Sequence, residues 1–165
     1  MKLLMLITKL VLKILYRVNV SGLEHVKASG ERVLIVANHT SYLDAVLLAL
    51  FLGVPISFAM KQQQMDRWWI RFVKHKFPLL AVDYNDPMAM KTLIQHVKAG
   101  NKVVIFPEGR ITSTGSLMKI YPSSGMVADK ADAAILPVRI DGAQYSRFSL
   151  LKGQVRLRWF PEIKL

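Results

Sequence analysis

Short apolar runs alternate with longer segments whose apolar residues recur every three or four positions, and the alternation extends over most of the chain. The short runs are rich in β-branched residues and end at turn-forming residues, which predicts buried strands. Strands are expected at residues 16–20, 32–37, 56–60, 78–83, 103–106, 134–140 and 154–160. Helices are expected at residues 41–52, 87–99 and 118–131, and a loop at residues 21–31. Elements in this order predict an α/β fold with a mixed β-sheet flanked by helices.

The first residues of the chain combine a wide apolar face with regularly spaced cations. These cations are Lys2, Lys9, Lys13 and Arg17. Their spacing places them on one stripe of a helix. The charges are too frequent for a membrane-spanning helix or a signal-peptide core. The pattern favours a helix lying in a membrane interface, and the alternative is a surface helix packed on the core with its lysines in water.

Composition narrows the classes of partner. Hydrophobic residues make up 52% of the chain and the net charge is +12, so the protein is both apolar and basic. That combination favours an anionic membrane surface or an acidic partner over nucleic acid. The absence of cysteine excludes disulfides, thiol nucleophiles and thiolate metal sites. The histidines show no metal-ligand spacing, so we expect no metal and no cofactor; they are His25, His39, His75 and His96.

Aromatic and basic side chains are interleaved at residues 61–77. Aromatic rings beside cations are typical of surfaces that lie among lipid headgroups. The same mixture binds single-stranded nucleic acid by stacking, and it also occurs where one tryptophan packs in a core below a solvated basic face. These three interpretations remain open for this segment.

The first candidate for chemistry is the pair His39 and Asp44, which follows a predicted strand and precedes a predicted helix. A turn at this point can bring the two side chains within hydrogen-bonding distance. A carboxylate on one imidazole nitrogen fixes the tautomer and leaves the other nitrogen as a base. The alternative is a capping box, in which Ser41 and Asp44 only satisfy free amides at the start of the helix.

A second group of polar residues follows the strand predicted at residues 103–106. Glu108, Gly109 and Arg110 supply a carboxylate, a flexible position and a guanidinium suited to phosphate, with Thr112 and Lys119 nearby. The alternative is an exposed turn with an Arg–Glu pair. The chain has no nucleotide-binding P-loop pattern.

Three blocks of the sequence together resemble the glycerolipid acyltransferase family, in the family's order and at its spacing. The blocks are residues 38–44, 106–110 and 135–138. A narrower resemblance, over residues 106–121 and 135–143, is to the acyltransferase domain of the bifunctional bacterial lysophosphatidylethanolamine acyltransferase/acyl-carrier-protein synthetase. The resemblance covers nearly the whole chain. It implies an acyltransferase domain at residues 18–165, and the pattern of apolar residues and cations before it predicts an amphipathic membrane-associating helix at residues 1–17.

The resemblance implies a role for each matching residue. His39 would be the general base that takes the proton of a glycerol hydroxyl, and Asp44 would orient its imidazole. Glu108, Gly109 and Arg110 would form the acceptor-binding loop, with Arg110 on the glycerophosphate. Asn38, Thr112 and Lys119 complete the predicted substrate-binding set, and Pro137 would shape the acyl pocket.

The sequence departs from the family pattern at two places. Arg110 follows Gly109 directly, where the family usually has a small residue first, and Thr112 takes the later hydroxyl position. Residues 83–85 lack the arginine that the family commonly carries after the middle strand, so that phosphate contact is either missing or supplied elsewhere, for example by Lys91 or Lys119. These departures favour a lysophospholipid with a headgroup over free lysophosphatidic acid as the acceptor.

The expected activity is acyl transfer from acyl carrier protein or acyl-CoA to a lysophospholipid, at a phospholipid surface on the cytoplasmic face of the bacterial inner membrane, by a peripheral or monotopic protein. Lysophosphatidic-acid acylation with acyl-CoA is the alternative reaction. A catalytically silent lipid-binding module is the alternative of another class, and nucleic-acid binding is not expected.

Overall fold

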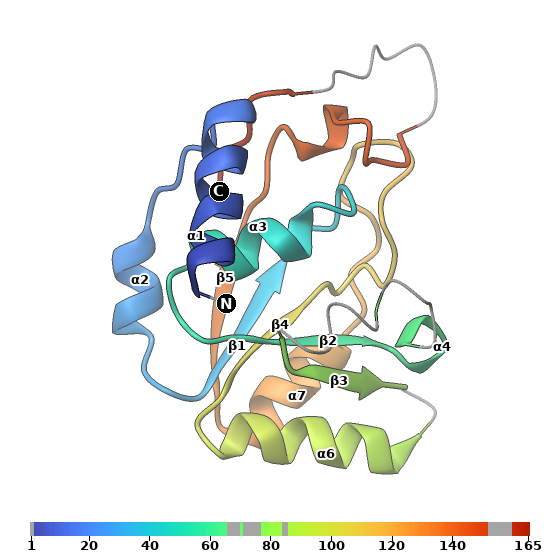
Figure 1. Ribbon diagram of the computed structural model, residues 1–165. Coiled ribbons are helices and arrows are strands. Elements are labelled where there is room, and N and C mark those ends of the chain that lie inside the picture. Colours follow the sequence, from blue (N-terminus) through green and yellow to red (C-terminus); the bar gives the residue numbers. More distant parts are fainter. Residues whose placement is uncertain (1, 66–69, 71–76, 84–85, 152–159) are drawn as a thin grey trace.

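The computed structural model describes residues 2–65, 70, 77–83, 86–151 and 160–165. At its centre is a five-stranded sheet in the order β3-β2-β4-β1-β5 (Figure 1). Its strands are β1 Val33–Ala37, β2 Ser57–Lys61, β3 Leu79–Val82, β4 Lys102–Ile105 and β5 Ala134–Val138. The predicted α/β class, with a sheet flanked by helices, is confirmed. Every pairing among the described strands is parallel, where the sequence predicted a mixed sheet.

Helices cover both faces of the sheet, and each face has its own apolar cluster. The helices are α1 Lys2–Leu15, α2 Leu23–Ala28, α3 Asp44–Phe51, α4 Gln62–Met65, α6 Pro87–Lys98 and α7 Ser123–Ala131. Leu47 and Leu48 of α3 are fully buried on one face, and Leu93 and Val97 of α6 are fully buried on the other. In Figure 1, α3 lies above the sheet, and α6 and α7 lie below it.

The parallel arrangement gathers the strand ends that matter for chemistry. Val36 of β1 is in register with Ile105 of β4 and with Pro137 of β5. Residues 38–44, 106–112 and 139–145 therefore leave the same edge of the sheet. Loops at this edge usually supply the binding groups of open α/β sheets.

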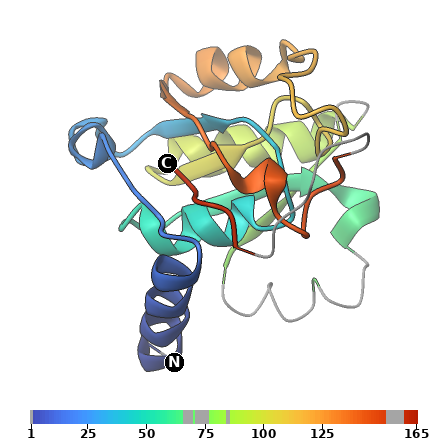
Figure 2. The same cartoon turned by 90° about the horizontal axis from the view of Figure 1, so that it is seen from above.

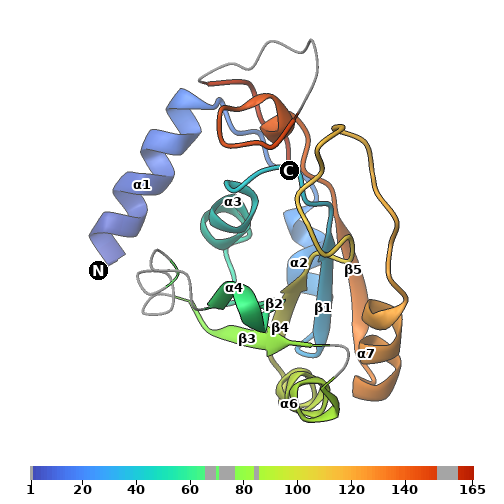
Figure 3. The same ribbon diagram turned by 90° about the vertical axis from the view of Figure 1, so that its right-hand side faces the viewer.

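Helix α1 contacts the rest of the protein along a narrow stripe. Met5 and Leu12 pack against the core cluster on the α3 face, and Lys9 Nζ lies 5.3 Å from the centre of the Phe51 ring. Figures 2 and 3 show α1 projecting from the body, with the N-terminus at its far end. Thr8 and Lys13 are exposed, and so are large apolar side chains that are each at least 40% exposed: Leu3, Leu4, Leu6, Ile7, Leu10, Val11, Ile14 and Leu15. Within the described residues, no helix is long and apolar enough to cross a bilayer.

The last residues of the chain connect two distant segments. Lys164 pairs with Asn19, just after α1, and with Asp141, just after β5. Ile163 is fully buried between them, and Asn19 Nδ2 donates to the Glu162 carboxylate at 3.1 Å. The exit of α1 and the loop after β5 are therefore held by the same short segment.

Two predictions near the N-terminus are wrong. Residues 21–31 contain helix α2 instead of a loop, because Gly22, at a φ of 74°, turns the chain so that Val26 is buried. One buried residue gives too little periodicity for a helix to be recognised. Residues 16–20 do not form a strand. They form a turn, followed by a single bridge in which Asn19 pairs with Lys164.

Three other boundaries also differ from the predictions. Helix α7 begins at Ser123 rather than at residue 118, because a residue before a proline disfavours helix and Pro122 stands just ahead of Ser123. Helix α3 begins at Asp44 rather than at residue 41, because residues 40–43 turn around the Asp44 carboxylate. Strand β5 ends at Val138 rather than at residue 140, where the Asn38 side chain binds the Ile140 backbone.

Two other predictions fall largely outside the described residues. The strand expected at residues 154–160 falls mostly in the segment 152–159, and the basic aromatic segment mostly in 66–69 and 71–76.

Candidate active site

His39 and Asp44 meet at the end of β1. The Nδ1 atom of His39 lies 2.9 Å from Asp44 Oδ2. The Asp44 side chain is fully buried, whereas the His39 side chain is 21% exposed. With Nδ1 held by the carboxylate, Nε2 is the imidazole nitrogen that can accept a proton from a substrate.

The turn between the two residues forms around the Asp44 carboxylate. Oδ2 accepts hydrogen bonds from the backbone amides of Thr40, at 2.5 Å, and Ser41, at 2.9 Å. Oδ1 accepts from the hydroxyls of the same two residues, at 3.1 and 3.0 Å. Asp44 thus satisfies the free amides before α3, as the capping interpretation predicted, and also bonds His39. The two interpretations are compatible, because the same carboxylate bonds both the turn amides and the imidazole.

The imidazole is also fixed from its flat side. The His39 ring is stacked on Phe106, with 4.1 Å between ring centres and 16° between planes. Phe106 directly follows β4, so the neighbouring strand supplies a surface against which the ring is held. This contact and the Asp44 bond together leave the ring little freedom to rotate.

Glu108 connects three segments of the site. One carboxylate oxygen accepts the His39 backbone amide, and the other accepts the Met118 amide, both at 2.8 Å. The residue is only 4% exposed. The geometry therefore shows Glu108 fixing the backbone on which the imidazole is carried, and its expected direct contact with the acceptor stays a prediction.

Two other predicted binding residues are engaged within the protein. The Asn38 side chain donates to the Ile140 carbonyl at 2.9 Å and accepts from the Ile140 amide at 2.7 Å, so it joins the ends of β1 and β5. The hydroxyl of Thr112, which is 2% exposed, donates to the Ser116 carbonyl and accepts from the Gly115 amide. Both residues shape the loops around the site.

The cations near the site are spread around Gly109. Arg110 and Lys119 are exposed, and Lys119 Nζ lies 5.7 Å from the centre of the Tyr121 ring. Gly109 has a φ of 67°, and a Cβ placed on it would lie 3.6 Å from Lys61 Nζ. Lys61, the last residue of β2, is a site candidate that the sequence analysis assigned only to the basic aromatic segment. Its position at a strand end was the available signal.

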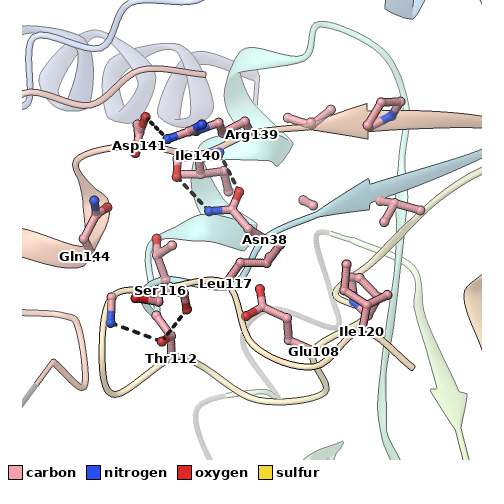
Figure 4. A pocket seen from close by; sticks show the side chains of 17 residues that line it. Asn38, Glu108, Thr112, Ser116, Leu117, Ile120, Arg139, Ile140, Asp141 and Gln144 are labelled. Atoms are coloured by element: carbon pink, nitrogen blue, oxygen red, sulfur yellow. Dashed lines mark hydrogen bonds and ion pairs between the residues drawn. The ribbon is translucent and has the colours of Figure 1, made fainter. Parts of the chain in front are cut away.

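A cavity of about 390 Å³ opens beside these loops (Figure 4). Pro137 lines it, as expected of a residue that shapes a pocket. So do Asn38, Glu108 and Thr112. Gln144, which the sequence analysis missed, also lines it from the short 3₁₀ turn Ala143–Tyr145. Nothing in the local sequence marks Gln144, because tertiary contacts place its turn at the cavity.

Comparisons with known proteins show the family of the chain. A profile of the family described as "Acyltransferase" matches residues 17–141, most of the chain. The chain is 28% identical to the chloroplastic 1-acyl-sn-glycerol-3-phosphate acyltransferase LPAT1 of Arabidopsis thaliana, over 77% of this chain and 36% of that protein. It is 26% identical to the 1-acyl-sn-glycerol-3-phosphate acyltransferase of Bacillus subtilis, over 90% of this chain and 75% of that protein. The chain therefore spans little more than a third of the length of the plant relative.

A solved structure shares the fold. The crystal structure of the 1-acyl-sn-glycerophosphate acyltransferase PlsC from Thermotoga maritima superposes with a TM-score of 0.63 and 24% identity, over 89% of this chain and 57% of that chain.

Proposed function

Because the chain belongs to the acyltransferase family, we propose that it moves a fatty acyl group from a thioester donor to a free glycerol hydroxyl of a lysophospholipid. The observation that carries the proposal is the pairing of His39 with the buried Asp44, at 2.9 Å. An oriented imidazole at a strand end is the group that deprotonation of a hydroxyl requires.

The proposed reaction is a direct transfer. His39 Nε2 takes the proton of the glycerol hydroxyl while that oxygen attacks the carbonyl carbon of the thioester. The carbon–sulfur bond breaks, the new ester bond remains, and the imidazolium returns its proton to the leaving thiolate. Asp44 stabilises the imidazolium and holds its orientation. The chain has no cysteine, and this route requires no covalent enzyme intermediate.

The phosphate of the acceptor would lie on the side of the loop where the cations gather. Lys61 approaches Gly109 there, and Arg110 is exposed beside it. Cations at a glycine turn suit a phosphate, because the backbone allows close approach. Lys61 could thus replace the arginine that residues 83–85 lack.

Two acceptors are in question. The names of the relatives point to 1-acyl-glycerol-3-phosphate. The narrower resemblance of residues 106–121 and 135–143, and the departures at 83–85 and at Arg110, point instead to a lysophospholipid with a headgroup such as lysophosphatidylethanolamine. We propose the latter as the preferred acceptor, with acyl carrier protein or acyl-CoA as donor.

The setting that we propose is a membrane surface, on the cytoplasmic face of the bacterial inner membrane. Helix α1 supports it, because most of its exposed side chains are apolar, with Lys13 exposed among them, while Lys9 lies over the ring of Phe51. A surface helix packed on the core would bury its apolar residues instead. An interfacial helix would keep the domain at residues 18–165 close to its lipid substrate.

The test compares acyl transfer from acyl carrier protein and acyl-CoA to a panel of lysophospholipids, with the full chain and its His39→Ala variant. Loss of the base should lower kcat by about 10²- to 10⁴-fold and leave liposome binding unchanged. His96→Ala is the matched control, because His96 is held by Ser57 away from the site and its loss should leave turnover within a few-fold.

Each outcome of this test decides between the candidates. Unchanged turnover in His39→Ala would overturn the base assignment. If the unmodified protein binds liposomes but turns over no thioester, the chain is a lipid-binding module. The acceptor with the highest kcat/KM identifies the reaction.

A further inference from the structure

The cavity begins directly beside the candidate base. Its lining includes Asn38 and Thr40, the residues on either side of His39. It also includes Pro107 and Glu108, which follow the Phe106 ring on which His39 is stacked. A molecule in the cavity would therefore lie next to the backbone that carries the imidazole.

One polar atom of the lining has no partner. Gln144 is 8% exposed, and its side-chain oxygen Oε1 is buried with no hydrogen bond to any described residue. Burying an amide oxygen without a donor costs free energy, so such atoms are rare in folded proteins. In Figure 4, Gln144 lies at one end of the cavity and Ile120 at the other.

The remaining lining is mainly apolar and carries little positive charge. Leu117, Ile120 and Pro137 contribute apolar surface. The charged lining residues are two carboxylates and one guanidinium, and the guanidinium of Arg139 is already paired with Asp141 at 2.9 Å. A phosphate would meet net negative charge here, whereas a neutral chain with N–H donors would be accepted.

We propose that this cavity binds the thioester donor, and that Gln144 Oε1 accepts the amide N–H of the carrier arm nearest to the thioester. The inference rests on the proposed function and deepens it by naming a binding residue for one of its two substrates. Coenzyme A and acyl carrier protein present the same pantetheine arm, whose amides are neutral and donate N–H groups. The fatty chain extends along Leu117 and Ile120.

The two substrates then approach from different sides. The acceptor phosphate belongs with Lys61 at Gly109, which is not among the lining residues. The donor lies behind the turn formed by Pro107 and Glu108. The pantetheine arm carries an amide N–H two carbons from the thioester sulfur, whereas the N–H group of lysophosphatidylethanolamine lies beyond the phosphate, in the headgroup; the acceptor KM in the experiment below separates the two.

The experiment measures KM and kcat for three donors with Gln144→Leu. The donors are acyl-CoA, the acyl N-acetylcysteamine thioester, which keeps the nearest amide, and the acyl S-ethyl thioester, which has none. The expected result is a rise in KM of about 5- to 20-fold for the first two donors and no change for the third. The KM for the acceptor should not move. Gln95→Leu, on the exposed side of α6, is the matched control.

The variant should fold, because leucine removes an oxygen that lacks a partner; the expected Tm is equal to or above that of the unmodified protein. Three results would each overturn the proposal: a higher KM of Gln144→Leu for the S-ethyl thioester, a higher KM for the acceptor instead of the donors, or KM values for all substrates equal to those of the unmodified protein. The second of these outcomes would place the acceptor headgroup at Gln144.

Failure of the proposed function is distinguishable from failure of this inference. If the unmodified protein turns over no substrate, binding of an unreactive acyl-CoA thioether is measured by calorimetry. Weaker binding to Gln144→Leu than to the unmodified protein supports the cavity assignment, and equal binding overturns it.

Discussion

Charged side chains usually lie at the surface of a protein and large apolar ones in its interior. The turn at Asp44 and the helix α1 depart from this distribution in opposite ways. Asp44 is a charged residue with no exposure at all. Helix α1 carries eight large apolar side chains that are exposed, among them Leu3 at 68% and Ile14 at 66%. Charged residues are seldom fully buried, and a large exposed apolar surface is uncommon in proteins that function alone in water.

The two regions differ in where their partners are. The Asp44 carboxylate accepts bonds from Thr40, Ser41 and His39, so its burial is explained within the chain. The outward face of α1 has no such explanation among the described residues. The burial of Asp44 is thus explained within the described residues, whereas the exposed face of α1 is the basis of our proposal that a membrane surface covers it.

The strongest way to break this comparison is Asp44→Ala. The change leaves two buried amides and His39 Nδ1 without their acceptor, so we expect about 3–5 kcal/mol of destabilisation. Turnover should fall on the order of 10³- to 10⁴-fold through lost orientation of the imidazole. Chemical denaturation and kcat measure the two effects. Asp129→Ala, on the exposed side of α7, is the control, and a comparable loss there would mean that the burial of Asp44 has no special weight.

The converse change is the pair Leu10→Ser and Ile14→Ser on the outer face of α1. Both side chains are more than half exposed, so the unfolding free energy should not fall. The double variant loses the favourable free energy of transferring these two apolar side chains from water into the membrane, so binding to anionic liposomes should weaken on the order of 100-fold. Co-sedimentation with vesicles measures the loss. Unchanged binding together with a lower Tm would show that α1 packs against protein instead.

Glu108→Gln tests whether the interior network extends beyond Asp44. The amide oxygen can still accept one of the two backbone amides, from His39 or Met118, but its NH₂ faces the other. We expect a loss of about 1–3 kcal/mol in stability. Because the imidazole is carried by the affected backbone, kcat should fall more than the acceptor KM rises. A change in the acceptor KM alone would assign Glu108 to substrate binding.

The smallest expected effect is that of Lys9→Ala on the inner face of α1. Its contact with the Phe51 ring is worth about 0.5–1 kcal/mol. Thermal unfolding should register a drop of that size, with liposome binding reduced by less than for the outer pair. A larger loss of binding than for Leu10 and Ile14 would assign membrane attraction to charge rather than to apolar area.

The sequence predicted well those elements that are determined by residues close to one another in the chain. The β-branched runs of β1 and β4 and the Asp86-Pro87 start of α6 carry strong local signals, and in the structure the Asp86 side chain accepts the Met88 amide as an N-cap. The positions of His39 and Glu108 just after predicted strands were also local signals, whereas their proximity follows from the parallel pairing of β1 with β4, which the sequence did not predict.

What the sequence could not predict depends on distant partners. Helix α2 is determined by burial of Val26, and the bridge at Asn19 by Lys164. Gln144 reaches the cavity because Gly142, at a φ of 92°, packs so closely on the Glu162 backbone that a Cβ would not fit. No window around residue 144 contains that information.

The segment at Ile163 and Lys164 also has a consequence for the order in which the protein is made. A ribosome produces the chain from its N-terminus, so α1 emerges long before the residues that hold its exit against the body at Asn19. During that interval the apolar helix is already complete, while the fold that will carry His39 is not. In the membrane setting that we propose, helix α1 would therefore reach a bilayer before the domain that carries His39 has folded, and that domain would then fold beside the surface where its lipid substrate lies.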